Sequence, residues 1–227
     1  MNIDAEQYFE LVKQDVFSAR IEWRLYRSLF GTNPETVEFL NKISGRTANT
    51  LERVLFERTL LNLRKLTDRP ENTRWNEKSV TLRGLSHFFF VEDAQLKRLQ
   101  TQAIEKASFA KNWSDKKIAH SDLDHRTNAV KLSSASRERV DNALEAAAEV
   151  IKHVAKEHYG YTQITHPIPD ANDERWFLLH LFEGARAFDE KERLSREYSA
   201  SGRYVERDSL YDFPSWLDRP EPPFDID

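Results

Sequence analysis

A stripe of apolar residues, spaced alternately three and four positions apart between residues 4 and 30, constrains the fold of this chain most strongly. Its members are Phe9, Val12, Val16, Ala19, Trp23, Tyr26 and Phe30. Because an α-helix has about 3.6 residues per turn, residues at these intervals lie on one side of it. Asp4 is a suitable N-cap and Gly31 a suitable stop. The pattern predicts a long helix that packs against other helices.

Helical periodicity continues through most of the chain. A shorter helix is expected after Asn33-Pro34, ending near Gly45, and further helices are expected at about 49–66, 79–90, 92–120, 134–158 and 172–198. With only 6 Gly and 8 Pro, the chain has too few turn residues for a β-sandwich or a barrel. We therefore predict an all-α fold, a helical bundle.

Composition excludes several classes of function. The absence of cysteine excludes disulfides, thiolate metal sites and a cysteine nucleophile. No apolar run approaches the length of a membrane span, and no secretory signal is visible, so we expect a cytoplasmic protein with no membrane partner. The chain carries a net charge of −4 and residues 208–227 carry −5, which leaves +1 for the rest. Such a surface is not that of an obligate duplex binder.

The last part of the chain differs from the rest in composition. After Ser201-Gly202, aromatic residues are scattered among acids and prolines, namely Tyr204, Tyr211, Phe213, Trp216 and Phe224. We predict a helical bundle over residues 1–202 and an acidic, aromatic, extended C-terminal tail over residues 203–227. The aromatic content indicates that the tail lies over the body of the protein or over a partner.

Ionisable residues gather near the middle of the chain, where the fourth long helix is expected to end. His120 can accept and return a proton near neutral pH. Lys116 lies one helical turn before His120, and Asp122 follows closely enough to orient the imidazole. A helix end also collects such residues simply as capping or solvated groups, and that interpretation remains open. The run in question is Ser114-Asp115-Lys116-Lys117-Ile118-Ala119-His120-Ser121-Asp122.

This run, which we call the motif segment (residues 114–122), resembles the signature of HEPN domains of the abortive-infection type. In these domains an arginine precedes a histidine by a few residues, often as Arg-Asp-Lys-x-x-Ala-His-x-Asp. Leu63-Arg64-Lys65-Leu66-Thr67-Asp68 also resembles an Arg-Leu-x-Asp ending found upstream in such proteins. The resemblance covers roughly residues 1–160 and implies a HEPN-like helical bundle that dimerises, with two motifs facing one cleft.

The resemblance also implies a function, because many such proteins are metal-independent ribonucleases that act as toxins or antiphage effectors. His120 would then transfer protons at the RNA 2′-hydroxyl or leaving oxygen. The motif arginine would stabilise charge on the scissile phosphate. The expected partners are RNA, a second copy of the chain and a cognate antitoxin or other protein. The candidate catalytic residues are His120, Asp115 and Lys116, and the candidate substrate-binding residues are Ser114, Lys111, Lys117 and Asp122.

The sequence departs from the family pattern at the arginine position, which Ser114 occupies. A serine cannot supply the positive charge, so Lys116, Lys111, Arg58 or Arg64 would have to supply it in space. The alternative function is therefore a non-catalytic helical module that binds RNA or a protein.

We expect no metal and no cofactor. The run from His120 to His125 superficially resembles a metallo-β-lactamase motif, but the strand that such a motif requires is missing. His153 and His158 are five positions apart, do not share a helix face and are expected to be structural.

Overall fold

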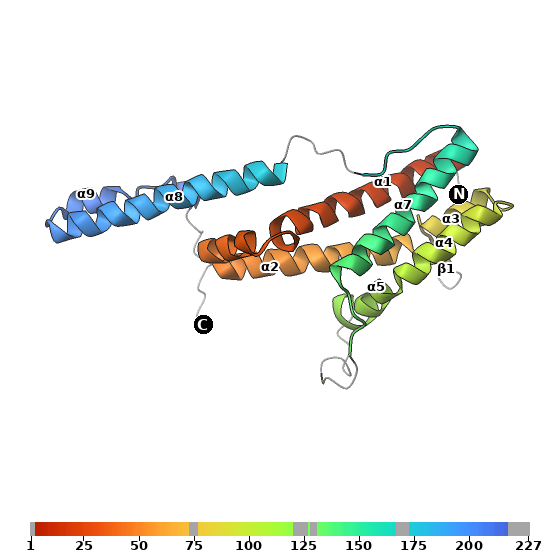
Figure 1. Ribbon diagram of the computed structural model, residues 1–227, viewed down its shortest axis with the longest axis horizontal. Helices are drawn as coiled ribbons and strands as arrows, with labels where there is room; N and C mark the ends of the chain where they lie inside the picture. The colour runs from red at the N-terminus through yellow and green to blue at the C-terminus, as the bar shows by residue number, and fades with distance from the viewer. Residues whose placement is uncertain (1–2, 73–76, 120–126, 128–130, 167–172, 218–227) are drawn as a thin grey trace, which may run out of the picture. The chain divides into compact units, whose positions relative to one another are not determined.

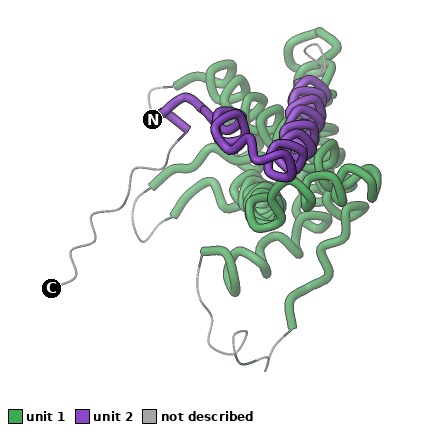
Figure 2. Tube along the Cα trace, turned by 90° about the vertical axis from the view of Figure 1, so that its left-hand side faces the viewer, with its two compact units in different colours: residues 1–170 green, residues 171–227 purple. Residues whose placement is uncertain are grey.

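The computed structural model describes residues 3–72, 77–119, 127, 131–166 and 173–217, and the fold is all-α as predicted (Figure 1). The one sheet in these residues is a two-stranded antiparallel ribbon of β1 (Glu71–Asn72) and β2 (Glu77–Lys78). The chain divides into two compact units, residues 1–170 and residues 171–227 (Figure 2), and we describe each by itself.

The first predicted helix is confirmed as α1 (Ala5–Tyr26), which continues into the π-helical turn η1 (Arg27–Gly31). Asp4 caps α1 in a capping box: its Oδ1 accepts from the backbone N–H of Gln7 at 2.8 Å. Every residue of the predicted apolar stripe is at most 5% exposed. Because burying one such side chain contributes roughly 1.5–3 kcal/mol, this stripe is a large part of the core.

The next two predicted helices are joined in one element, α2 (Pro34–Leu66), with a kink between them. Ser44 departs from helical geometry there, with φ −160° and ψ 88°. The C-terminal half of α2 buries Leu60 and Leu63 completely, whereas Leu51 and Val54 in the preceding turns are about half exposed. The C-terminal half of α2 is therefore the part that lies deepest in the core.

The polar segment before α3 (Leu82–Gly84) and the π-helical turn η2 (Leu85–Phe89) is fastened to α1 by one buried phenol. The Oη of Tyr8 accepts from the backbone N–H of Thr81 at 2.9 Å and lies 3.0 Å from the carbonyl oxygen of Ser79. A Cβ on Gly84 would lie 1.8 Å from that Oη, so only glycine fits. Burial raises the pKa of Tyr8.

The continuous helix predicted over residues 92–120 is wrong in detail. The chain forms α4 (Ala94–Lys106), then α5 (Ser108–Trp113), then the π-helical turn η3 (Ser114–Ile118). The break lies at Ala107, whose φ of −89° and ψ of 2° leave the helical region. No glycine or proline marks it, and the physical reason is packing: α4 packs on α7, whereas α5 packs on α2.

The predicted helix over residues 134–158 is confirmed as α7 (Arg137–Tyr159). Ser136 caps its N-terminus, and Gly160 ends it with a φ of 71°, in the left-handed region that favours glycine. Its apolar stripe is buried. Within residues 1–170, α1 lies along α2 and α7 lies along α4 (Figure 1), so the core sits between two helix pairs.

The second unit is built from α8 (Asp173–Ala200), α9 (Tyr204–Ser209) and the 3₁₀ turn η4 (Ser215–Leu217). The described part of the predicted extended tail is therefore partly helical. It folds back on α8, because the ring of Tyr211 lies 6.1 Å from that of Phe188. No helix in the described residues is long and apolar enough to cross a membrane.

Removing one hydroxyl should test how much the α1 contact with residues 79–84 contributes. We expect Tyr8→Phe to lower the free energy of unfolding by about 1–3 kcal/mol, because the buried N–H of Thr81 would lose its partner. Tyr204→Phe, the same change at a 55% exposed position, should change stability by less than about 0.5 kcal/mol. Urea denaturation measures both, and equal values for the two variants would contradict the assignment.

Candidate functional site

The described part of the motif segment lies against the C-terminal half of α2. The ring of Trp113, just before the segment, meets the ring of Phe56 edge to face at 5.7 Å. Its Nε1 donates to the carbonyl oxygen of Ser133 at 2.7 Å, and the side chain of Asn112 accepts from the N–H of Ser133 at 2.9 Å. The end of α5 is thus held between α2 and the segment that leads into α7.

Ser114 begins the π-helical turn η3 and is 5% exposed. Its carbonyl oxygen accepts from the N–H of Ala119 at 2.9 Å, a bond that spans five residues. Turns of this kind occur often at functional sites. The position at which the family signature has its arginine is therefore occupied here by a small, buried, uncharged side chain.

An arginine from α2 lies beside the motif instead. The Nε of Arg64 is 3.9 Å from Oδ1 of Asp115, and its Nη1 is 2.6 Å from Oδ1 of Asp68. The Arg64 side chain is 21% exposed. The other arginine expected to be able to replace the motif arginine, Arg58, pairs instead with Glu22 at 3.2 Å. Of these two arginines, Arg64 is therefore the one that contacts a residue of the motif segment.

Two motif-region lysines are held by carboxylates. Lys111 donates to Oδ2 of Asp115 at 2.7 Å, and Lys117 lies 3.1 Å from Oε1 of Glu57 and 4.9 Å from the centre of the Trp113 ring. Ion pairs at the surface are each worth only about 0–1 kcal/mol, so these contacts hold the two lysines only weakly. Lys116 is half-buried and forms no ion pair with another residue that the structure describes.

The structure therefore brings together five of the seven candidate site residues: Lys111, Ser114, Asp115, Lys116 and Lys117. His120 and Asp122 lie outside the described residues. In the sequence, Arg64 belongs to the upstream run of residues 63–68 and is one of four possible substitutes for the motif arginine, but no local spacing indicates that it lies beside Asp115. Asp68, at the end of the same upstream run, completes the group.

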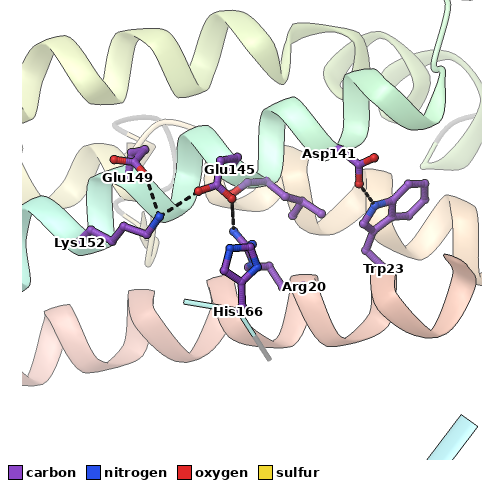
Figure 3. A network of polar contacts seen from close by, with 8 residues as sticks. Arg20, Trp23, Asp141, Glu145, Glu149, Lys152 and His166 are labelled. Carbon is purple, nitrogen blue, oxygen red and sulfur yellow. Dashed lines mark hydrogen bonds and ion pairs between the residues drawn. The ribbon is translucent and has the colours of Figure 1, made fainter. Parts of the chain in front are cut away.

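A second polar group, which no local sequence pattern indicates, joins α1 to α7 (Figure 3). Arg20 is 9% exposed, and its Nη1 donates to Oε2 of Glu145 at 3.0 Å. Its Nη2 lies 2.8 Å from Nδ1 of His166; because a guanidinium only donates, Nδ1 accepts and the imidazole proton lies on Nε2. Lys152 bridges Glu145 and Glu149 at 2.9 Å and 2.7 Å.

The negative charge of the Glu145 carboxylate is strongly stabilised by its neighbours. Partial burial raises the pKa of this carboxyl, but hydrogen bonds from Lys152 and Arg20 outweigh it and lower the pKa to about 2. Next to it, Asp141 accepts from Nε1 of Trp23 at 2.6 Å and pairs with Arg27 at 2.6 Å. Arg20, Arg27 and Lys152 are all paired with carboxylates of α7. This group therefore acts as a polar clamp, a set of ion pairs and hydrogen bonds that joins α1 to α7.

A third group lies where α4 begins and α7 ends. Oδ2 of Asp93 is 2.9 Å from Nε2 of His153 and 2.7 Å from Nε2 of His158. Burial raises the pKa of Asp93, but hydrogen bonds from the Leu96 N–H and from both histidines lower it to about 2. The sequence predicts a structural role for His153 and His158. It does not predict their shared contact with Asp93, because Asp93 is distant in sequence.

Neutralising Glu145 should weaken the clamp between α1 and α7 in a pH-dependent way. We expect Glu145→Gln to cost about 1–2 kcal/mol of unfolding free energy near pH 7, a value reduced because the carboxylate is 43% exposed. Since its pKa falls from 4.5 to about 2 on folding, the contribution is complete above pH 4.5 and is lost as the pH falls toward 2.

Denaturant unfolding at several pH values measures this difference. Glu149→Gln, a 49% exposed partner of Lys152 alone on the same helix, is the matched control and should stay close to the wild type. A difference between wild type and Glu145→Gln that did not shrink below pH 4.5 would contradict the assignment.

Comparison with known proteins identifies the family. No curated protein and no solved structure matches the chain. The sequence model of the AbiU2 family, HEPN_AbiU2, matches residues 3–176, which is about three quarters of the chain and includes the whole motif segment. The match agrees with the all-α bundle and with the motif at the end of α5. The chain therefore belongs to the AbiU2 family of HEPN proteins, a family of the abortive-infection type.

Proposed function

We propose that this protein is a metal-independent endoribonuclease of the abortive-infection type, in which Arg64 of α2 supplies the positive charge that Ser114 cannot. The observation that carries the proposal is the approach of Arg64 to the motif residue Asp115, at 3.9 Å. The chemistry itself is assigned to His120, at the histidine position of the family signature.

His120 acts in proton transfer. As a general base it removes the proton from an RNA 2′-hydroxyl, whose oxygen then attacks the adjacent phosphorus. The bond from phosphorus to the 5′-oxygen breaks, and that oxygen takes up a proton, which the imidazolium formed in the first step can return. An imidazole suits either role, because its ordinary pKa lies near neutral pH. Asp122 follows His120 closely in sequence and is assigned to its orientation.

Arg64 is suited to bind the scissile phosphate. Its guanidinium is planar and offers several donors, which match two phosphate oxygens at once. Asp68 and Asp115 hold it in place from two sides, and its partial exposure leaves an approach for an anion. Preorganised charge of this kind stabilises a transition state more than a mobile lysine does.

The surrounding residues favour a nucleic acid as the substrate. Lys111, Lys116 and Lys117 add positive charge beside the motif. An open pocket of about 750 Å³ lies beside α2 and is lined by Phe56, whose ring also contacts Trp113 just before the motif segment. Tyr26 and Arg53 also line it, and aromatic and guanidinium surfaces are those on which unpaired bases stack.

The family likeness supports three further proposals. The protein forms a homodimer in which two motifs share one cleft, it acts in the cytoplasm, and a cognate antitoxin or another protein restrains it. Each rests on the resemblance of the motif segment and on the family match.

A non-catalytic module that binds RNA or a protein is the second candidate, and a specific observation favours it. Three of the cations around the motif, Lys111, Lys117 and Arg64, are already paired with carboxylates. Together with a buried serine at the arginine position, this leaves less free positive charge for phosphate than an active centre of this type needs.

Loss of the histidine separates the two candidates. Purified protein incubated with total RNA should cleave it in the presence of EDTA, and His120→Ala should abolish the cleavage. RNA products resolved by gel electrophoresis give the measurement. Absence of cleavage by both proteins, with RNA binding retained in a gel-shift assay, would support the non-catalytic module and overturn the nuclease.

Replacing Arg64 tests the substitution proposed for the motif arginine. We expect Arg64→Ala to lower the cleavage rate about a hundredfold or more, because it removes the charge on the phosphate. Arg64→Lys should recover part of it. Arg58→Ala, on the same helix but paired with Glu22, is the matched control and should cleave like the wild type. Equal loss in both alanine variants, at equal thermal stability, would contradict the role of Arg64.

A further inference from the structure

A group of three metal-ligating side chains lies away from the motif. Asp93 precedes α4, while His153 and His158 lie on the last two turns of α7. Both Nε2 atoms point at the same oxygen, Oδ2 of Asp93, at 2.9 Å and 2.7 Å. The three donor atoms all lie within 4.8 Å of one another. Two imidazoles that converge on one carboxylate oxygen present two nitrogens and one oxygen to a single point.

The convergence is not what helix geometry alone would produce. Residues five positions apart are separated by about 140° around a helix axis, so His153 and His158 start on different faces of α7. The carboxylate of Asp93 lies between those faces, and each ring turns toward it. Because α7 ends at Tyr159, His158 lies in its last turn.

The donor set matches divalent transition metals. Imidazole nitrogen with one carboxylate suits zinc, and three protein ligands with one open position are common at zinc sites. Metal–ligand bonds of about 2.0–2.2 Å place tetrahedral donors about 3.3 Å apart. The two nitrogens lie 2.9 Å and 2.7 Å from Oδ2, within about 0.6 Å of that spacing, and all three donor atoms lie within 4.8 Å of one another.

Neighbouring groups hold these side chains in place. Oδ1 of Asp93 accepts from the N–H of Leu96 at 2.8 Å, which leaves Oδ2 facing the histidines. The ring of Phe90 stacks on that of His158 with centres 3.9 Å apart. Such supporting contacts orient the ligands of natural metal sites. The three side chains are 14–26% exposed, so an ion can enter and a water molecule can complete its coordination.

We propose that Asp93, His153 and His158 bind one divalent transition-metal ion, with zinc as the best-matched species, and that the ion ties the start of α4 to the end of α7. The site is separate from the motif, because the 13 residues of α4 (about 20 Å of helix) lie between Asp93 and α5. It stabilises the fold and takes no part in the proposed RNA chemistry.

Metal titration of the full-length, untagged protein tests the proposal. After treatment with EDTA and its removal, one equivalent of Zn²⁺ should bind with micromolar or tighter affinity in calorimetry and should raise the melting temperature. Co²⁺ should bind at the same site and give the visible absorption of a nitrogen- and oxygen-ligated ion.

Three variants complete the design. His158→Gln should weaken Zn²⁺ binding at least about tenfold to a hundredfold. His87→Gln, an exposed histidine paired with Glu71, should bind like the wild type. Should His158→Gln fail to fold, Asp93→Asn keeps the N-cap, since asparagine also caps helices, while it removes the ligand charge. Absence of Zn²⁺ and Co²⁺ binding, or equal affinity in wild type and Asp93→Asn, would overturn the proposal.

Discussion

Burial of one face of α1 is the interaction on which the rest of the structure depends. This helix packs on α2, on α7 and on η2, and its Val12, Val16 and Ala19 are completely buried. The same face carries Tyr8, which fixes residues 79–84, and Trp23, which donates to Asp141 of α7. Polar contacts at its edges therefore set the register of an interface whose stability comes mainly from apolar burial.

The position of the motif segment follows from the packing of α4 on α7 and of α5 on α2. The segment from residue 94 to residue 118 must pack on α7 with its first part and on α2 with its second, so the helix bends at Ala107. That bend places η3 beside the end of α2, where Arg64 meets Asp115. A straight helix would separate the motif from the only arginine that the described residues bring to its acids.

Carboxylates decide what the cations and histidines of this protein do. Asp115 and Asp68 orient Arg64, while Glu145 holds the buried guanidinium of Arg20. Asp93 draws two histidines to one oxygen. The pKa of Asp93 and that of Glu145 are both held at about 2, so these two acids stay charged throughout the ordinary pH range. An acid in such surroundings is a fixed anchor and not a proton donor.

Much of the fold could be predicted from the sequence, because the apolar stripes of α1 and α7, the Asp4 cap and the Gly160 stop are local patterns. The residues of the motif segment, including the serine at its arginine position, could also be read directly from the sequence. Only the tertiary structure placed Arg64 at the motif and Asp93 between two histidines. Those contacts join residues more than 50 positions apart, and their existence depends on side-chain packing between helices, which no local spacing encodes.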